Sequence, residues 1–166
     1  PRGIVASDTI LSGMIASLLP AERYSVGVIL PPGQCPGHYD VKLSDMEKVR
    51  KAALVVSFRG MSFMERAGLE GGSLLLVDGG GRNWMAPDSY IRGIRLLAGE
   101  LSKRFPEDGG EIAARRERAV AVVKAKAEEL SGRVLRARVR GMPVLASSMQ
   151  KEPLEWMGLR VVGEYG

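Results

Sequence analysis

Short apolar runs alternate with helical patterns along the first half of the chain. The continuous apolar runs occupy residues 4–6, 24–30, 54–58 and 73–77. Patterns typical of helices lie between them, at about 8–19, 44–52 and 62–67. Continuous apolar strands separated by helices indicate a parallel sheet that is covered on both faces. We therefore predict an α/β fold that begins with a parallel four-stranded sheet lobe with flanking helices.

Polar residues mark where two of these helices begin. Ser7 or Asp8 is expected to cap the first helix, because its side chain can accept hydrogen bonds from the first turn. At the second helix Ser44 and Asp45 are the expected caps, and Glu47 follows Ser44 at the spacing of a capping box. These signals support the helices that the apolar pattern predicts.

The pattern changes after the glycines at 79–81. One helix is expected over 88–105, and a longer one from about 111 to 130 or beyond. The apolar stripe of the long helix is predicted to face inward; it comprises Ile112, Ala119, Val123, Ala127, Leu130 and Val134. A strand (142–146), a short helix (152–157) and a strand (159–162) follow.

We divide the chain into three parts on this basis. They are an α/β lobe (1–87), a helical segment with a long linker helix (88–140) and the start of a second α/β lobe (141–166). A two-stranded unit with one short helix cannot shield its apolar residues. We expect it to join the first sheet, to self-associate with another copy, or to belong with a missing second lobe.

The composition is typical of a globular protein, with 45% hydrophobic and 26% charged residues. Residues 111–140 hold nine Lys or Arg against four Glu, which accounts for the whole net charge of +5. We interpret this segment as a solvated helix face. Nucleic-acid binding is not expected, because no aromatic residues interleave the basic run to stack on bases.

The single cysteine and the single histidine restrict the possible chemistry. They exclude a disulfide framework, a Cys-rich zinc module and any site with two histidines. Cys35 and His38 form a Cys-x-x-His pair on the loop after the second strand, where α/β sheets place ligands. With Asp40 they are candidate ligands for a soft metal ion such as Zn²⁺ or Cu⁺. The alternatives are an exposed loop histidine beside a partly buried cysteine, and a cysteine nucleophile, which lacks an oxyanion-stabilising motif.

A glycine loop follows the fourth strand and leads into Arg82 and Asn83. Its backbone N–H groups and Arg82 are candidates for binding an anion. The loop lacks the phosphate-binding patterns of nucleotide sites, and the alternative is a flexible turn with an exposed arginine. Trp84 and Trp156 are interpreted as packing residues. The eight methionines show no repeat and are interpreted as core filling rather than a copper-binding tract.

The order and spacing of several segments resemble a known family, the substrate-binding proteins of zinc and manganese ABC importers. Residues 30–49 (LPPGQCPGHYDVKLSDMEKV) are similar to the family's first metal-ligand region, with its Pro-Pro-Gly turn. Residues 48–60 and 83–87 resemble its helix-to-strand passage and its His-x-Trp-x-Asp-Pro segment. Residues 101–130 resemble the helix that connects the two lobes, and 143–163 resemble the opening of the second lobe.

The resemblance implies an extracytoplasmic solute-binding protein of the metal-binding, adhesin-like lipoprotein type, and no enzyme. Such a protein captures zinc or manganese as the transported ligand, in a cleft between its lobes, and docks on an ABC permease. The family's first two ligand positions fall on Gly37 and Arg82, and its third falls on Ser147 or a neighbouring residue. Arginine cannot bind a metal ion, because it stays protonated and has no acceptor. We therefore expect weak Zn²⁺ binding, with Arg82, Asn83 and Ser147 as ligand-contact positions.

Two other functions stay open on the sequence. The first is a stand-alone binding or scaffold module that has lost metal binding and acts through a protein partner or an anionic ligand. The second, less favoured, is an enzyme or a nucleotide-binding domain of flavodoxin type.

Overall fold

The computed structural model describes residues 1–68, 73–81 and 84–166. Its strands are β1 (Arg2–Ala6), β2 (Tyr24–Val28), β3 (Leu54–Phe58), β4 (Leu74–Val77), β5 (Pro143–Ser147) and β6 (Arg160–Tyr165). Its α-helices are α1 (Thr9–Leu18), α2 (Leu43–Lys51), α3 (Ser62–Arg66), α4 (Pro87–Arg104), α5 (Gly109–Ala137) and α6 (Lys151–Trp156). Three 3₁₀ turns are η1 (Pro36–His38), η2 (Pro106–Asp108) and η3 (Ser148–Gln150).

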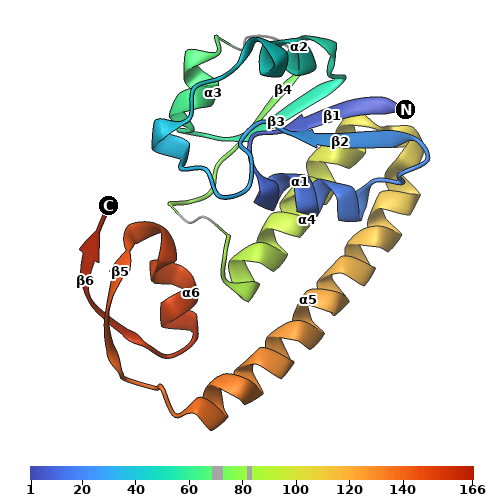
Figure 1. The fold of residues 1–166 in the computed structure, drawn as a ribbon. Coiled ribbons are helices and arrows are strands. Elements are labelled where there is room, and N and C mark those ends of the chain that lie inside the picture. The colour runs from blue at the N-terminus through green and yellow to red at the C-terminus, as the bar shows by residue number, and fades with distance from the viewer. Residues whose placement is uncertain (69–72, 82–83) are drawn as a thin grey trace.

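The first four strands form one parallel sheet in the order β2-β1-β3-β4. Successive residues of β1 and β3 point to opposite faces, as strand geometry requires. Ile4 and Val56 join α1, α4 and α5 in one buried cluster, while Val5 and Val55 join α2 and α3 in another. Figure 1 shows helices on both faces of the sheet. The prediction of a four-stranded parallel sheet with flanking helices is confirmed.

The start of α1 agrees with the prediction, but the start of α2 does not. Asp8 caps α1, and its Oδ1 accepts hydrogen bonds from the backbone N–H groups of Ile10 (2.9 Å) and Leu11 (3.0 Å). The predicted capping box at Ser44 is wrong, because α2 begins one residue earlier and Ser44 lies inside its first turn. Asp45 provides the cap instead, accepting a hydrogen bond from the Lys42 N–H at 3.0 Å.

Helix α5 is longer than predicted, with 29 residues, and only its first half packs on the lobe (Figure 1). Ile112 and Val120 are buried there, whereas Val122 and Leu135 are 69% and 79% exposed. The other residues of the predicted apolar stripe are half-buried. No helix among the described residues is both long and apolar enough to span a membrane.

Strands β5 and β6 do not join the first sheet. They pair with each other in parallel and form a separate two-stranded sheet, connected by η3 and α6. Figure 1 shows this unit at the far end of α5, where it lies below the open edge of the first lobe. Of the predicted alternatives for the last 25 residues, pairing with the first sheet is therefore wrong.

Candidate functional site

The order of the strands creates a crevice at one edge of the sheet. From β1 the chain passes through α1 to β2 on one side, and from β2 through α2 to β3 on the other side. The carboxyl ends of β1 and β3 therefore lie at a point where the connections diverge, which is where open α/β sheets bind ligands.

A cavity of about 420 Å³ lies at this edge, and we call it the cleft. The described residues that line it are Asp8, Thr9, Ile10, Leu30, Gln34, Pro36, Phe58, Arg59, Gly60, Met61, Asp78, Gly79, Gly81, Met85 and Met149. They follow the ends of β1, β2, β3, β4 and β5, so the cleft is bordered by both the first lobe and the β5–β6 unit.

Asp8 is the buried acidic group of the cleft. Burial raises the pKa of its carboxyl group, while hydrogen bonds from the Leu11 N–H, the Ser7 hydroxyl and the Ile10 N–H oppose that shift. Its Oδ1 is occupied by the cap of α1 and its Oδ2 by Ser7. The carboxylate thus combines a structural role with a negative charge at the cleft.

The glycine loop after β4 forms another wall of the cleft. The Gly80 N–H donates to Asp78 Oδ1 at 2.8 Å, so a carboxylate of the protein itself takes a backbone donor that an anion would need. Arg82 and Asn83, the predicted ligand contacts of this loop, lie outside the described residues.

The predicted metal ligands of the loop after β2 lie at its surface. Cys35, His38 and Asp40 are all exposed, and the loop residues that line the cleft are Gln34 and Pro36. Within 1–68, 73–81 and 84–166, no three His, Cys, Asp or Glu side chains form a group that could hold a metal ion. The structure therefore does not bring Cys35, His38 and Asp40 together, and their role stays a prediction.

Tyr39 is the residue of this loop that turns into the core, while Cys35, His38 and Asp40 stay exposed. Its ring is buried edge-on against Phe63, and its hydroxyl donates to Asp45 Oδ2 at 2.6 Å. The hydrogen bond to Asp45, followed by burial, raises the pKa of Tyr39 to about 12. Burial alone would raise the pKa of Asp45, but hydrogen bonds from Tyr39 and Lys42 and the charge of Lys48 lower it overall.

Trp84 anchors the segment that enters α4. Its ring packs edge-on against Phe58, with ring centroids 4.8 Å apart, and it covers the backbone of Gly93. The prediction that Trp84 is a packing residue is confirmed. The next residue along the chain, Met85, lines the cleft.

Sequence reasoning missed the methionines of the cleft. Met61, Met85 and Met149 line it from three separate segments, whereas Met14 and Met64 fill the cores as predicted. Their place in the sequence could have indicated this, because Met61 and Met149 each follow the end of a predicted strand by three residues.

Ser147 lies at the end of β5, beside the cleft rather than among its lining residues. Its Oγ accepts a hydrogen bond from the Met149 N–H at 3.4 Å and caps η3. The described geometry gives Ser147 a positioning effect on Met149, and its predicted contact with a ligand stays a prediction.

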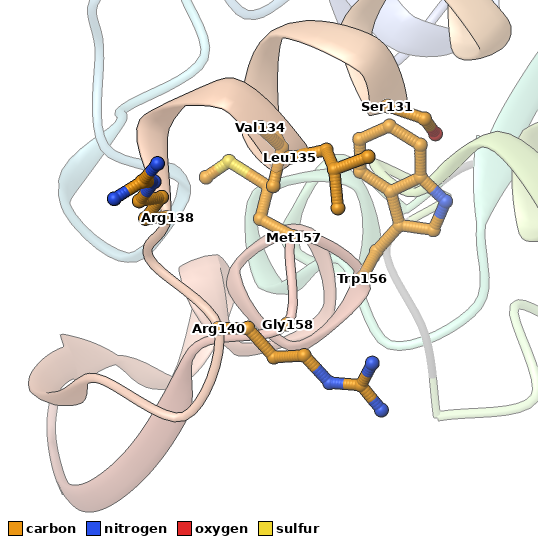
Figure 2. Close-up of a pocket in the computed structure, with 8 residues that line it drawn as sticks. All are labelled: Ser131, Val134, Leu135, Arg138, Arg140, Trp156, Met157 and Gly158. Atoms are coloured by element: carbon orange, nitrogen blue, oxygen red, sulfur yellow. The ribbon is translucent and has the colours of Figure 1, made fainter.

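A second cavity, of about 440 Å³, lies where α6 meets the end of α5 (Figure 2). Figure 2 shows Trp156 and Met157 facing Val134 and Leu135, with the guanidinium groups of its two arginines directed away from these apolar side chains. The described residues lining it are Ser131, Val134, Leu135, Arg138, Arg140, Trp156, Met157 and Gly158. This cavity lies at the joint between helix and second unit and is separate from the strand ends.

Solved structures with this fold are known. The substrate-binding protein FpvC from Pseudomonas aeruginosa, in complex with Ni²⁺, matches 98% of this chain with a TM-score of 0.81 and 14% identity. The metal-dependent lipoprotein YcdH from Bacillus subtilis matches 98% (TM-score 0.78, 11% identity), and Zn(II)-bound AdcA from Streptococcus pneumoniae matches 99% (0.80, 12%). No family model matches the chain, and no curated protein matches its sequence.

These comparisons define the class of fold. The chain has the α/β fold of the first lobe of metal-ion substrate-binding proteins, together with a long helix and the start of another lobe. The resemblance to zinc and manganese substrate-binding proteins is thus confirmed at the level of the fold. The chain spans 66% of the length of FpvC, 67% of YcdH and 39% of AdcA.

Proposed function

We propose that this chain is part of an extracytoplasmic solute-binding protein of a metal-ion ABC importer, of the zinc and manganese type. The observation that carries the proposal is the cleft at the carboxyl edge of the sheet, between the first lobe and the β5–β6 unit. It occurs in a fold shared with metal-binding substrate-binding proteins over nearly the whole chain. The protein binds and delivers its ligand and catalyses no reaction.

The proposal divides the molecule into a lobe (1–87), a helical connector (88–140) and the start of a second lobe (141–166). The connector is firmly joined to the lobe at one end. Arg23 pairs with Asp108 at 2.7 Å and with Glu111 at 2.6 Å, and Tyr24 donates to Asp108 at 2.5 Å. In this proposal the helix carries the second unit and limits how far the two parts move relative to each other.

The metal is zinc or manganese as transported ligand, and the residues to test first are His38, Cys35 and Asp40. Arg82, Asn83 and Ser147 occupy positions that contact the ligand. Since Gly37, Arg82 and Ser147 replace the ligands of the related proteins, we infer that this chain alone binds Zn²⁺ weakly.

The partner in this proposal is an ABC permease in the membrane, as the class of solute-binding proteins implies. The exposed apolar residues of the β5–β6 unit require further cover, from a second lobe or from another copy of the chain. The alternative of a stand-alone module that has lost metal binding is not favoured, because the structural neighbours include proteins with bound Ni²⁺, Mn²⁺ and Zn²⁺.

Isothermal titration calorimetry with Zn²⁺ and Mn²⁺ tests the proposal. We expect one weak site per chain, with a dissociation constant above about 1 μM. Cys35→Ser, His38→Ala and Asp40→Asn are expected to weaken it further, whereas Asp88→Asn, an exposed change on α4, is the matched control. Absence of heat at millimolar metal would contradict the function, and submicromolar one-to-one binding would contradict the assignment of Gly37, Arg82 and Ser147 to ligand positions.

A further inference from the structure

Two methionines of the cleft are far more exposed than methionines that fill a core. Met85 and Met149 are 39% and 48% exposed, whereas Met14 is fully buried. Met61 is half-buried at the same cleft. Gap filling, the usual role of methionine, therefore does not account for Met85 and Met149.

The three side chains reach the cleft from independent segments of the fold. Met61 directly precedes α3, Met85 lies between β4 and α4, and Met149 lies in η3. Trp84 fixes the segment of Met85, and the cap by Ser147 fixes that of Met149. The cleft thus brings together methionine side chains from three separate segments, and Met61 also packs against both buried clusters.

The remaining described lining residues are a poor set of ligands for zinc. Asp8 and Asp78 are the acidic side chains among them, and they include no histidine or cysteine. Zinc takes three or four nitrogen, oxygen or sulfur ligands from thiolate, imidazole and carboxylate groups. Thioethers instead select soft ions, of which Cu⁺ is the biological example.

The charge at the cleft also suits a monovalent cation. Thioethers are neutral, so an ion bound by three of them keeps its full charge. Among the described lining residues, Asp8 and Asp78 against Arg59 give a formal charge of −1, from two acidic groups and one basic group. This charge offsets that of one Cu⁺.

We propose that the cleft binds a soft monovalent metal ion, Cu⁺, through the thioether sulfurs of Met61, Met85 and Met149. The inference rests on the proposed function in taking the cleft as the ligand site, and it assigns that site a softer ion than the zinc or manganese proposed above. Since Met149 belongs to the β5–β6 unit, the bound ion links that unit to the first lobe.

Nuclear magnetic resonance of ¹³C-methyl-labelled methionine tests the site directly. Ag⁺ serves as the probe because it shares the soft character of Cu⁺ and does not change oxidation state. The experiment uses Cys35→Ser protein, since the exposed thiol of Cys35 competes for Ag⁺. We expect the methyl signals of Met61, Met85 and Met149 to shift together up to one equivalent. The signal of Met142, which is exposed outside the cleft, is expected to stay unchanged.

Methionine-to-leucine variants add a quantitative measure, because leucine keeps the volume and removes the sulfur. Met85→Leu and Met149→Leu are each expected to weaken Ag⁺ binding by about tenfold or more, measured by competition with a soft-metal chelator. Met142→Leu is the matched control and is expected to leave the affinity unchanged. Unchanged affinity in both cleft variants, or loss of all binding in Cys35→Ser protein, would overturn the inference.

A parallel titration with Mn²⁺, on protein that retains Cys35, separates this inference from the proposed function. If Mn²⁺ perturbs the cleft and the leucine variants still bind Ag⁺ normally, the thioether site is wrong and the proposed function stands. If neither ion perturbs the cleft, both proposals fail. Binding of Ag⁺ at the three methionines without any effect of Mn²⁺ supports the thioether site and restricts the ligand to soft ions.

Discussion

Trp84 illustrates how single residues shape the cleft. It adopts a left-handed backbone conformation (φ 57°), which is rare for a large side chain, and its ring is buried between Phe58 and α4. A Cβ atom at Gly93 would lie 2.5 Å from Trp84 Cε3. The Trp84 ring therefore leaves no room for a side chain at position 93. The packed ring also holds the segment that carries Met85.

Gly93→Ala is predicted to destabilise the protein by about 1–3 kcal/mol, because the added methyl group overpacks the Trp84 ring. Gly99→Ala on the same helix is the matched control, since nothing lies within 4 Å of the added atom. The control is expected to stabilise α4 by about 0.5–1 kcal/mol. Urea unfolding curves measure both, and equal effects of the two variants would contradict this account of Trp84.

The Asp45 carboxylate is expected to make stability depend on pH. Its pKa in the folded protein lies below the ordinary value of 3.8, so its contribution is complete above that value. The contribution is lost as the pH falls through the lowered folded pKa. At neutral pH, Asp45→Ala is predicted to cost about 2 kcal/mol, because the charged partner of Tyr39 and Lys42 is removed.

Unfolding measurements across the acid range test this prediction, with Asp40→Ala as the exposed neighbouring control. The difference between wild type and Asp45→Ala is expected to shrink as the pH falls, while the control stays close to wild type throughout. A difference that is independent of pH would show that the charge of Asp45 does not contribute.

At the scale of elements, the junction between the sheet and α5 controls the position of the connector. Asp108 is buried at the start of α5, accepts a hydrogen bond from the Tyr24 hydroxyl and forms a salt bridge with Arg23. Arg2 and Glu107 form a second pair nearby, at 2.6 Å, but both side chains are about half exposed. The Tyr24–Asp108 hydrogen bond is buried, so loss of either partner leaves the other unsatisfied, whereas the exposed Arg2–Glu107 pair is screened by solvent.

Asp108→Ala is predicted to destabilise the protein by about 2–3 kcal/mol, because it leaves the buried Tyr24 hydroxyl without its acceptor. Glu107→Ala is the control, with an expected cost within about 1 kcal/mol. Burial and the hydrogen bond to Asp108 raise the pKa of Tyr24 to about 12, so this pKa is expected to fall in Asp108→Ala. Ultraviolet titration of tyrosine and urea unfolding measure the two effects, and an unchanged Tyr24 pKa would refute the assigned contact.

Much of the element structure could be predicted from the sequence. Strand β3 is buried on both faces, and this burial is why its residues form an unbroken apolar run. The start of α2 could not be predicted, because Ser44 and Asp45 are both good caps and the contact with Tyr39 decides between them. That contact joins residues six positions apart, and no local pattern specifies it.

The cleft was harder to predict than the sheet. The Cys-x-x-His spacing of Cys35 and His38 does not determine which side chains of the loop turn inward, and Tyr39 takes the buried position. The convergence of Met61, Met85 and Met149 depends on how three distant loops meet. The strand order brings the segments of Met61 and Met85 to one edge of the first sheet, while Met149 comes from the separate β5–β6 unit, and the apolar pattern alone gives neither placement.

At the scale of the whole molecule, the β5–β6 unit exposes apolar side chains on a small sheet. Leu145 is 72% exposed, and Val162 and Tyr165 are more than half exposed. Groups of exposed apolar residues mark interaction surfaces. The chain of 166 residues is therefore predicted to self-associate through this unit.

Sedimentation analysis at micromolar concentrations measures this association. We expect a concentration-dependent dimer, and Leu145→Ser is expected to shift it toward monomer. Val122→Ser, which removes an exposed apolar residue from the middle of α5, is the control and is expected to dimerise as wild type does. A monomer at all concentrations would contradict the prediction.

The most direct test of the account is to locate a bound metal ion by paramagnetic relaxation. Mn²⁺ broadens the amide signals of residues near it, even when it binds weakly, so the measurement does not depend on high affinity. We expect the strongest broadening at the carboxyl edge of the sheet, around Asp8, Gly60 and Gly79. Broadening centred instead on the acidic residues at the opposite edge, Glu107 and Asp108, would contradict a metal-binding cleft at the strand ends.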